Sequence, residues 1–212
     1  SYRRRFIYTE NKAYDATVAL QFYGSMIEGI VANNITARTG GYNGDAMSGE
    51  ANWFNQFLGN TIEAGNSYRG PRNEIPPLDA QLGLLAYGAG SDQHKYPLVR
   101  SCVVRNNHLK SNARLHVMGW VADALIEKNR IEHADVGAVV SESAQNIVLR
   151  GNVFQDVGKP YDYAPQSVVI SPSEELASAM DGAAALMSGE PPAEWKGLRS
   201  GKPLDGATPE QV

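Results

Sequence analysis

A short segment, Arg114-Leu115-His116-Val117-Met118, contains residue types that can carry acid-base chemistry. Successive side chains of a β-strand point to opposite faces, so if Leu115 and Val117 face a core, the other three point outward. An arginine that neutralises a uronate carboxylate, beside a histidine that takes the adjacent carbon-bound proton, is a minimal set of groups for β-elimination. An ordinary exposed strand fits the same pattern. We predict Arg114 and His116 as candidate catalytic residues.

Tyr87 is a third candidate catalytic residue, because it falls at a comparable strand position. Stacked strands would bring it near His116 and create a small cluster of acid-base groups on one face. The segment after Tyr87 adds Asp92, His94 and Lys95. Asp92, His94 and His116 could ligate a metal ion, but their spacing matches no dedicated metal motif, so we predict no metal site.

Residues suited to sugar binding occur in and beside the polar stretches of the chain, as aromatic rings, cations and carboxylates. A glycosidase needs two facing carboxylates, about 5 Å apart for retention or roughly 6.5 to 9.5 Å apart for inversion. The sequence does not give these separations, and loop acids are often simply solvated, just as a tryptophan often packs in a core. The candidate substrate-binding residues are His94, Lys95, Trp53, Tyr68, Arg69, Asp45, Glu50, Asp79 and Asp92.

The elements that would position these residues are marked by an asparagine that recurs in one setting. A large apolar residue stands three positions before it and another two positions after it, in each case. A frame that returns after about one coil indicates a solenoid, in which the amides stack into a ladder. The gap of 47 residues between the second and third copies holds either two coils or one coil with large loops. The predicted ladder residues are Asn33, Asn60, Asn107, Asn129 and Asn152.

Short alternating apolar runs precede most of these asparagines, which is typical of strands with one buried face. A second strand-like run lies some ten residues upstream of most copies, at residues 19–23, 84–87, 115–118 and 138–140. Polar insertions interrupt the repeats at residues 37–51 and 64–81, and a shorter one at 89–97. Insertions into a solenoid often gather on its binding face, so we expect the first two to wall a groove beside the candidate catalytic residues.

The predicted organisation has three parts: an N-terminal strand or cap remnant at residues 1–17, a parallel β-helix at 18–158, and a C-terminal region at 159–212. The last region is expected to contain a final strand at 168–170, a helix at 173–187 and an extended tail. Nothing before Val18 resembles a convincing cap, and an uncovered solenoid end invites strand pairing. We therefore expect additional coils or a neighbouring chain at this end, and a mature or trimmed product, since the sequence opens at Ser1.

Two kinds of solenoid share this asparagine frame, namely leucine-rich repeats and parallel β-helices. Leucine-rich repeats need leucine at most consensus positions, whereas the flanking positions here are mostly Ile, Val and Phe, with leucine only at Leu109 and Leu149. β-branched residues favour strands. The residues therefore favour an all-β solenoid, a right-handed parallel β-helix with a C-terminal helix and tail.

Segments 99–131 and 137–154 resemble the pectin-lyase-like superfamily of right-handed parallel β-helices, and the resemblance covers roughly residues 18–158. It implies a carbohydrate-active protein that binds a polysaccharide or oligosaccharide in a groove along one sheet. A secreted or periplasmic location is also expected, although no signal peptide opens the chain. The Asp-Asp and Gly-His-Gly motifs of polygalacturonases are absent, as is a clear calcium-binding aspartate cluster of pectate lyases. Lyase and hydrolase thus both stay open; no cofactor is required by the sequence, and calcium stays an open alternative.

Composition narrows the function classes further. The 212 residues are 42% hydrophobic and 20% charged, with a formal net charge of −4, which predicts a soluble globular protein without general attraction to nucleic acid. No stretch is apolar enough for a transmembrane helix. The single cysteine, Cys102, occupies an apolar repeat position and is expected to act as a small hydrophobe. Two other functions stay open: a non-catalytic β-helix that serves as a binding or structural module, and a leucine-rich-repeat-like partner binder.

Overall fold

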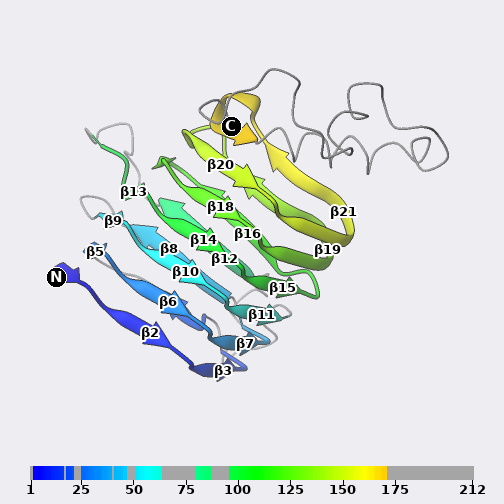
Figure 1. The fold of residues 1–212 in the computed structure, drawn as a ribbon, viewed down its shortest axis with the longest axis horizontal. Helices are drawn as coiled ribbons and strands as arrows, with labels where there is room; N and C mark the ends of the chain where they lie inside the picture. Colours follow the sequence, from blue (N-terminus) through cyan, green and yellow to red (C-terminus); the bar gives the residue numbers. More distant parts are fainter. Residues whose placement is uncertain are drawn as a thin grey trace, which may run out of the picture. The chain divides into compact units, whose positions relative to one another are not determined.

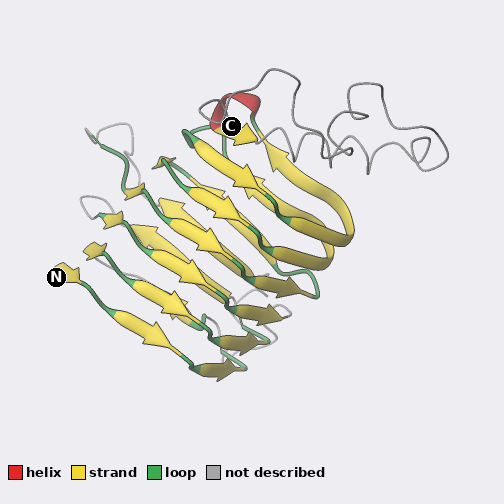
Figure 2. Ribbon diagram, in the orientation of Figure 1, coloured by secondary structure: helices red, strands yellow, loops and turns green. Residues whose placement is uncertain are grey.

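The protein is an all-β parallel solenoid, which confirms the predicted fold class (Figures 1 and 2). A computed structural model describes residues 2–16, 18–21, 25–39, 41–46, 51–63, 80–86 and 96–170. The predicted C-terminal helix at 173–187 and the tail lie outside the described residues. Strand β22 (Val168–Ile170) confirms the predicted last strand, and one turn of 3₁₀-helix, η2 (Pro165–Ser167), precedes it.

Two sheets form two sides of the stack, and every strand pairs with its neighbours in parallel (Figure 1). Among the described residues, the first sheet contains β1 (Tyr2–Arg4), β5 (Ser25–Ile27), β9 (Asn52–Trp53), β13 (Val99–Arg100) and β17 (Val121–Ala122). The second contains β2 (Ile7–Thr9), β6 (Ile30–Ala32), β10 (Gln56–Leu58), β14 (Val103–Arg105), β18 (Leu125–Glu127), β20 (Ile147–Arg150) and β22.

The third sheet has two halves that meet in two long strands. One half contains β3 (Lys12–Tyr14), β7 (Ile35–Ala37), β11 (Thr61–Glu63) and β15 (His108–Lys110). The other contains β4 (Leu20–Gln21), β8 (Gly41–Ala46), β12 (Gln81–Ala86) and β16 (Arg114–Met118). Strands β19 (Arg130–Val140) and β21 (Val153–Tyr163) run through both halves. The coils contribute strands to three sheets, whereas a leucine-rich repeat has strands on its concave face only. The leucine-rich-repeat alternative is therefore wrong.

The coils are held together by stacked apolar residues and by the asparagine ladder. Phe57, Val104, Ile126 and Leu149 occupy equivalent positions on successive strands, and each is at most 1% exposed. Burying such a column removes apolar surface from water, which is the main stabilising contribution in a solenoid without disulfides. Cys102 is also buried in this core, and desolvation raises the pKa of its thiol to about 12, so it packs as a small hydrophobe.

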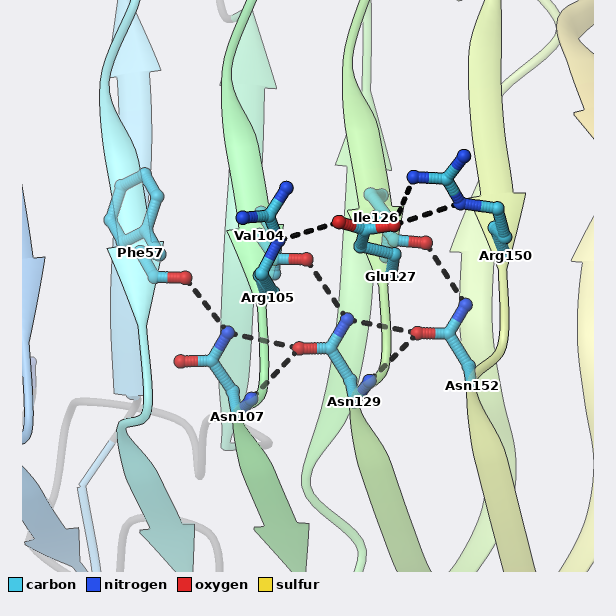
Figure 3. A network of polar contacts seen from close by, with 9 residues as sticks. All are labelled: Phe57, Val104, Arg105, Asn107, Ile126, Glu127, Asn129, Arg150 and Asn152. Atoms are coloured by element: carbon cyan, nitrogen blue, oxygen red, sulfur yellow. Dashed lines mark hydrogen bonds and ion pairs between the residues drawn. The ribbon is translucent and has the colours of Figure 1, made fainter.

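The ladder repeats one set of hydrogen bonds from coil to coil (Figure 3). The Oδ1 atom of Asn129 accepts the backbone N–H and the side-chain N–H of Asn107, at 3.0 and 2.9 Å. The Nδ2 atom of Asn129 donates to the carbonyl of Val104 and to Oδ1 of Asn152, at 3.0 and 2.9 Å. Asn129 is fully buried, so these bonds satisfy backbone groups that water cannot reach. The ladder consists of Asn11, Asn34, Asn60, Asn107, Asn129 and Asn152.

One predicted ladder residue was wrong by a single position. Asn33 is exposed and adopts a left-handed backbone with φ of 55°, whereas its neighbour Asn34 is 1% exposed and joins the ladder. The inward position two residues after Asn34 holds Thr36, so the apolar frame is missing there. Ile35, which produced the apparent frame, is instead 40% exposed on the outside. The predictions for the other four ladder asparagines are confirmed.

Two further features of the repeat are settled by strand pairing. Phe57 lies directly opposite Val104, so the 47-residue gap contains one coil with large connecting segments. The predicted insertion at 37–51 was partly wrong, because β8 lies within it and pairs with β4 and β12. Strands β1, β2 and β3, in the segment assigned to a strand or cap remnant, pair with β5, β6 and β7 as a first coil.

In the part of the chain that the structure describes, no helix has the length and apolar character needed to span a membrane.

Candidate functional site on the β12–β16 face

Strand β16 alternates between core and surface as its sequence predicted. Leu115 and Val117 are each 1% exposed and belong to the core, while Arg114, His116 and Met118 are half-buried on the outer side. The outer residues of β16 and of its neighbour β12 form the β12–β16 face. Its members are Gln81, Gly83, Leu85, Arg114, His116 and Met118. Gly83 and Leu85 are buried, and the other four are half-buried.

The register between β12 and β16 fixes which residues surround His116. Gly83 lies directly opposite His116, and Gln81 lies opposite Arg114. Gly83 has no side chain to cover the imidazole, and Gln81 reaches diagonally to it, with Oε1 2.9 Å from Nδ1 of His116. On the other flank, β19 places the apolar Val139 opposite His116. The imidazole is therefore held by one amide, and the residues directly opposite it on the two neighbouring strands, Gly83 and Val139, are uncharged.

The charge state of His116 follows from these surroundings. Burial lowers the pKa of His116 below its ordinary value of 6.5, and the positive charge of Arg114 lowers it further. The imidazole is therefore neutral at neutral pH, and one of its ring nitrogens has a lone pair that can accept a proton. A neutral base and a permanent cation thus stand two residues apart on one outer face, which is the pairing that proton abstraction beside a carboxylate requires.

Long segments of the chain precede and follow strand β12, which contributes to this face. Strand β12 is preceded by residues 64–79 and followed by residues 87–95, and both stretches lie outside the described residues. On the next coil the corresponding connections are short, because β15 ends at Lys110 and β17 begins at Val121, with β16 between them. Long insertions at both ends of one strand are the usual sequence mark of a solenoid's binding face.

The structure assigns the predicted site residues to different places. Tyr87 directly follows the last residue of β12 and lies outside the described residues, and the β12 residue opposite His116 is Gly83. The backbone of Asp45 lies in β8 opposite Leu85, so it belongs to the row that contains Met118 on β16. The remaining predicted substrate-binding residues outside the described range are Glu50, Tyr68, Arg69, Asp79, Asp92, His94 and Lys95.

Trp53 belongs to another sheet, so the structure does not bring it to Arg114 and His116. It lies in β9, where its indole Nε1 donates a hydrogen bond to the carbonyl of Pro97 at 3.1 Å. Its ring packs edge-on against Tyr96, with centroids 5.5 Å apart. These contacts fix the orientation of the Trp53 ring, and Tyr96 beside it is 42% exposed.

A second polar cluster, in the β11–β15 half of the third sheet, was not predicted. His108 Nε2 lies 3.0 Å from a carboxylate oxygen of Glu132, Arg130 contacts the same carboxylate, and Arg130 also donates to Gln155 at 2.7 Å. The hydrogen bond from His108, followed by that from Arg130, lowers the pKa of Glu132. In this half of the sheet, the residues one and three positions after each ladder asparagine face outward, as His108 after Asn107 and Arg130 and Glu132 after Asn129 do. This spacing is visible in the sequence and could have predicted the cluster. Its charges neutralise one another, which is typical of a structural network.

Metal-binding clusters and similarity to known proteins are two further features that could indicate a function. Within the described ranges, no three His, Cys, Asp or Glu side chains gather where they could hold a metal ion. No family model matches the chain, and no curated protein or solved structure matches it either. The solenoid and its outer faces are therefore the basis for any functional conclusion.

Proposed function

We propose that this protein cleaves an acidic polysaccharide at the β12–β16 face by β-elimination at a uronate residue. The observation that carries the proposal is the pair of Arg114 and His116, a cation and a neutral imidazole that share one half-buried outer face. Membership of the pectin-lyase-like superfamily and a secreted or periplasmic location belong to the same proposal.

The chemistry follows from the roles that the two side chains can fill. Arg114 binds the uronate carboxylate and stabilises the negative charge that develops beside it. His116 takes the proton from the carbon next to that carboxylate. The electron pair of the broken C–H bond forms a C=C bond, and the neighbouring C–O bond breaks towards the glycosidic oxygen. The leaving oxygen receives this proton from the imidazolium, so His116 ends the cycle neutral.

The solenoid suits a long polymer for a geometric reason. Parallel strands repeat about every 4.8 Å across a sheet, so a few coils present a continuous outer face to several sugar units. The backbone of Asp45 in β8 is in register with Leu85 and so lies two strands away from Met118, at about 10 Å across the sheet.

The test is a panel of uronate polymers incubated with the protein, with the ultraviolet absorbance of the unsaturated product as readout. At least one polymer should be cleaved, and His116→Ala and Arg114→Ala should each lower the rate by about 100-fold or more. Arg130→Ala, which removes an exposed arginine from the other half of the sheet, is the matched control and should leave the rate unchanged. New reducing ends without ultraviolet absorbance would instead indicate a hydrolase, and no cleavage of any polymer would reject the proposal.

The alternative function, a non-catalytic structural or binding module, is favoured by one observation on the seven-stranded sheet. Its strands have two outward rows, and one of them is almost wholly apolar, with Ile7 73% exposed at one end and Val169 53% exposed at the other. The other row contains the ion pairs of Arg105, Glu127 and Arg150. Large exposed apolar patches usually mark an interaction surface. Light scattering that shows a stable assembly, together with no cleavage of any glycan, would favour this module over the enzyme. The apolar row consists of Ile7, Ile30, Gln56, Val103, Leu125, Val148 and Val169.

A further inference from the structure

We propose that Gln81 is a positioning residue, which keeps a proton on Nδ1 of His116 and thereby makes Nε2 the atom that accepts the substrate proton. The inference has two parts. The statement that Nε2 accepts the substrate proton rests on the proposed function. The statement that Nδ1 carries a proton does not, because the tautomer is a property of the protein without substrate.

The tautomer follows from the partner of the imidazole. The Gln81 atom that faces Nδ1 is the amide oxygen Oε1, at 2.9 Å. An amide oxygen only accepts hydrogen bonds, so Nδ1 must carry the proton that it receives. A neutral imidazole has a single N–H, and Nε2 is therefore left with the lone pair.

Gln81 is itself held in place by the fold. The core residues Leu82 and Leu84 are each 1% exposed and fix β12 against the core, so the residues between and beside them face outward. The parallel register then places Gln81 opposite Arg114, one diagonal step from His116. A contact between two paired strands whose alternate residues are buried does not need to be assembled when a substrate binds, which is the condition for preorganised catalysis.

The arrangement also suits both halves of a proton transfer. When Nε2 takes a proton, the ring becomes an imidazolium with an N–H on each nitrogen, and Oε1 of Gln81 continues to accept from Nδ1 without rearrangement. Arg114 stands on the same face and disfavours that second positive charge. The proton is therefore held weakly and can pass from Nε2 to the leaving glycosidic oxygen.

The direct test is ¹⁵N NMR of protein with labelled histidine, because the two ring nitrogens have different shifts when protonated and unprotonated. The sequence has four histidines, and the signals of His116 are assigned as those missing from His116→Ala. At pH 8 we expect Nδ1 of His116 to be protonated and Nε2 to be unprotonated. A wild-type spectrum with the proton on Nε2 of His116 overturns the inference.

Two substitutions of Gln81 separate positioning from a purely structural role. Gln81→Leu removes the acceptor, so His116 should become a mixture of both tautomers, with kcat about tenfold lower and KM nearly unchanged. Gln81→Glu keeps an acceptor and adds a negative charge, so Nδ1 should stay protonated while the pKa of His116 rises. The acid limb of the activity profile should then move to higher pH, because the base must be neutral to work.

The matched control is Gln56→Leu, which removes an exposed glutamine from the seven-stranded sheet and should leave the signals of His116 unchanged. If Gln81→Leu also leaves them unchanged, Gln81 does not set the tautomer and the inference fails. If the tautomer is as expected but no polymer is cleaved, the positioning stands and the proposed function fails. The two conclusions can therefore be rejected separately.

Discussion

At the scale of single residues, the fold depends on buried amides that each serve two coils. Asn129 accepts two hydrogen bonds from Asn107 and donates one to the carbonyl of Val104. A residue of similar size without the amide would leave these buried groups without partners. Because buried polar groups lose water as well as their protein partner, the loss is larger than for an exposed asparagine.

Asn129→Leu should therefore lower the free energy of unfolding by about 1 to 3 kcal/mol for each buried group left unpaired. Chemical denaturation followed by circular dichroism measures this change. Asn33→Gly is the matched control, because Asn33 is exposed, lies outside the ladder and has a left-handed backbone that glycine adopts readily. Equal losses for both variants would contradict the ladder as described.

The lowered pKa of His116 has a consequence for stability as well as for catalysis. The folded state binds this proton less readily than the unfolded state does, so stability is lost as the pH falls from about 6.5 towards the folded-state pKa. His116→Gln removes the titrating group but keeps an amide that can face Gln81. Its melting temperature should fall less than that of the wild type between pH 7 and pH 5. If the melting temperature of the wild type instead rises relative to that of the variant as the pH falls from 7 to 5, the pKa of His116 is not lowered and this account is contradicted.

At the scale of elements, ion pairs connect neighbouring strands on the outer surface. Glu127 in β18 is 2% exposed and lies between Arg105 in β14 and Arg150 in β20 (Figure 3). Its Oε1 atom is 2.5 Å from Nε of Arg105, and its Oε2 atom accepts from Nε of Arg150 at 2.8 Å. The hydrogen bond from Arg150 is the main cause of the lowered pKa of Glu127, and Arg105 adds to it.

Glu127→Gln should cost about 1 to 2 kcal/mol of stability at pH 7, because it leaves two arginines beside an uncharged amide. Since the folded-state pKa is lowered, this stabilisation is fully present above the ordinary value of 4.5 and disappears as the pH falls through the folded-state pKa. Urea denaturation at pH 7 and at a series of lower pH values down to pH 3 follows this loss. Glu28→Gln, at an exposed ion pair with Arg4 and Arg5, should cost less at pH 7. A Glu127→Gln cost that is larger at pH 3 would contradict this account.

The strands with β-branched, alternating residues could be predicted from the sequence, and β8 could not. β8 (Gly41–Ala46) contains no β-branched residue, and it is extended because it pairs with β4 and β12. The outward side of Arg114 and His116 was predictable from alternation alone. The contact with Gln81 was not, because it depends on the register between two strands that are separated by most of a coil in the sequence.

At the scale of the whole solenoid, the outer faces differ in chemistry although the coils repeat. The seven-stranded sheet presents an apolar row beside a row of ion pairs that contains Glu127. The β11–β15 half of the third sheet presents a neutralised charge network, and the β12–β16 face presents a base beside a cation. A repeat with a uniform core can vary its outward residues coil by coil, since those residues contribute little to stacking. We propose function on the β12–β16 face because a neutral base and a cation lie there on one outer side.

The most direct measurement is a crystal structure of His116→Ala bound to an oligosaccharide of a polymer that the wild-type protein cleaves. The substitution should prevent turnover and keep the Arg114 contact. The account predicts a uronate carboxylate on the guanidinium of Arg114, with the sugar chain running over β12 and β16 and the reacting carbon facing the place of the missing imidazole. An oligosaccharide bound over the seven-stranded sheet, or one whose carboxylates avoid Arg114, would contradict the account.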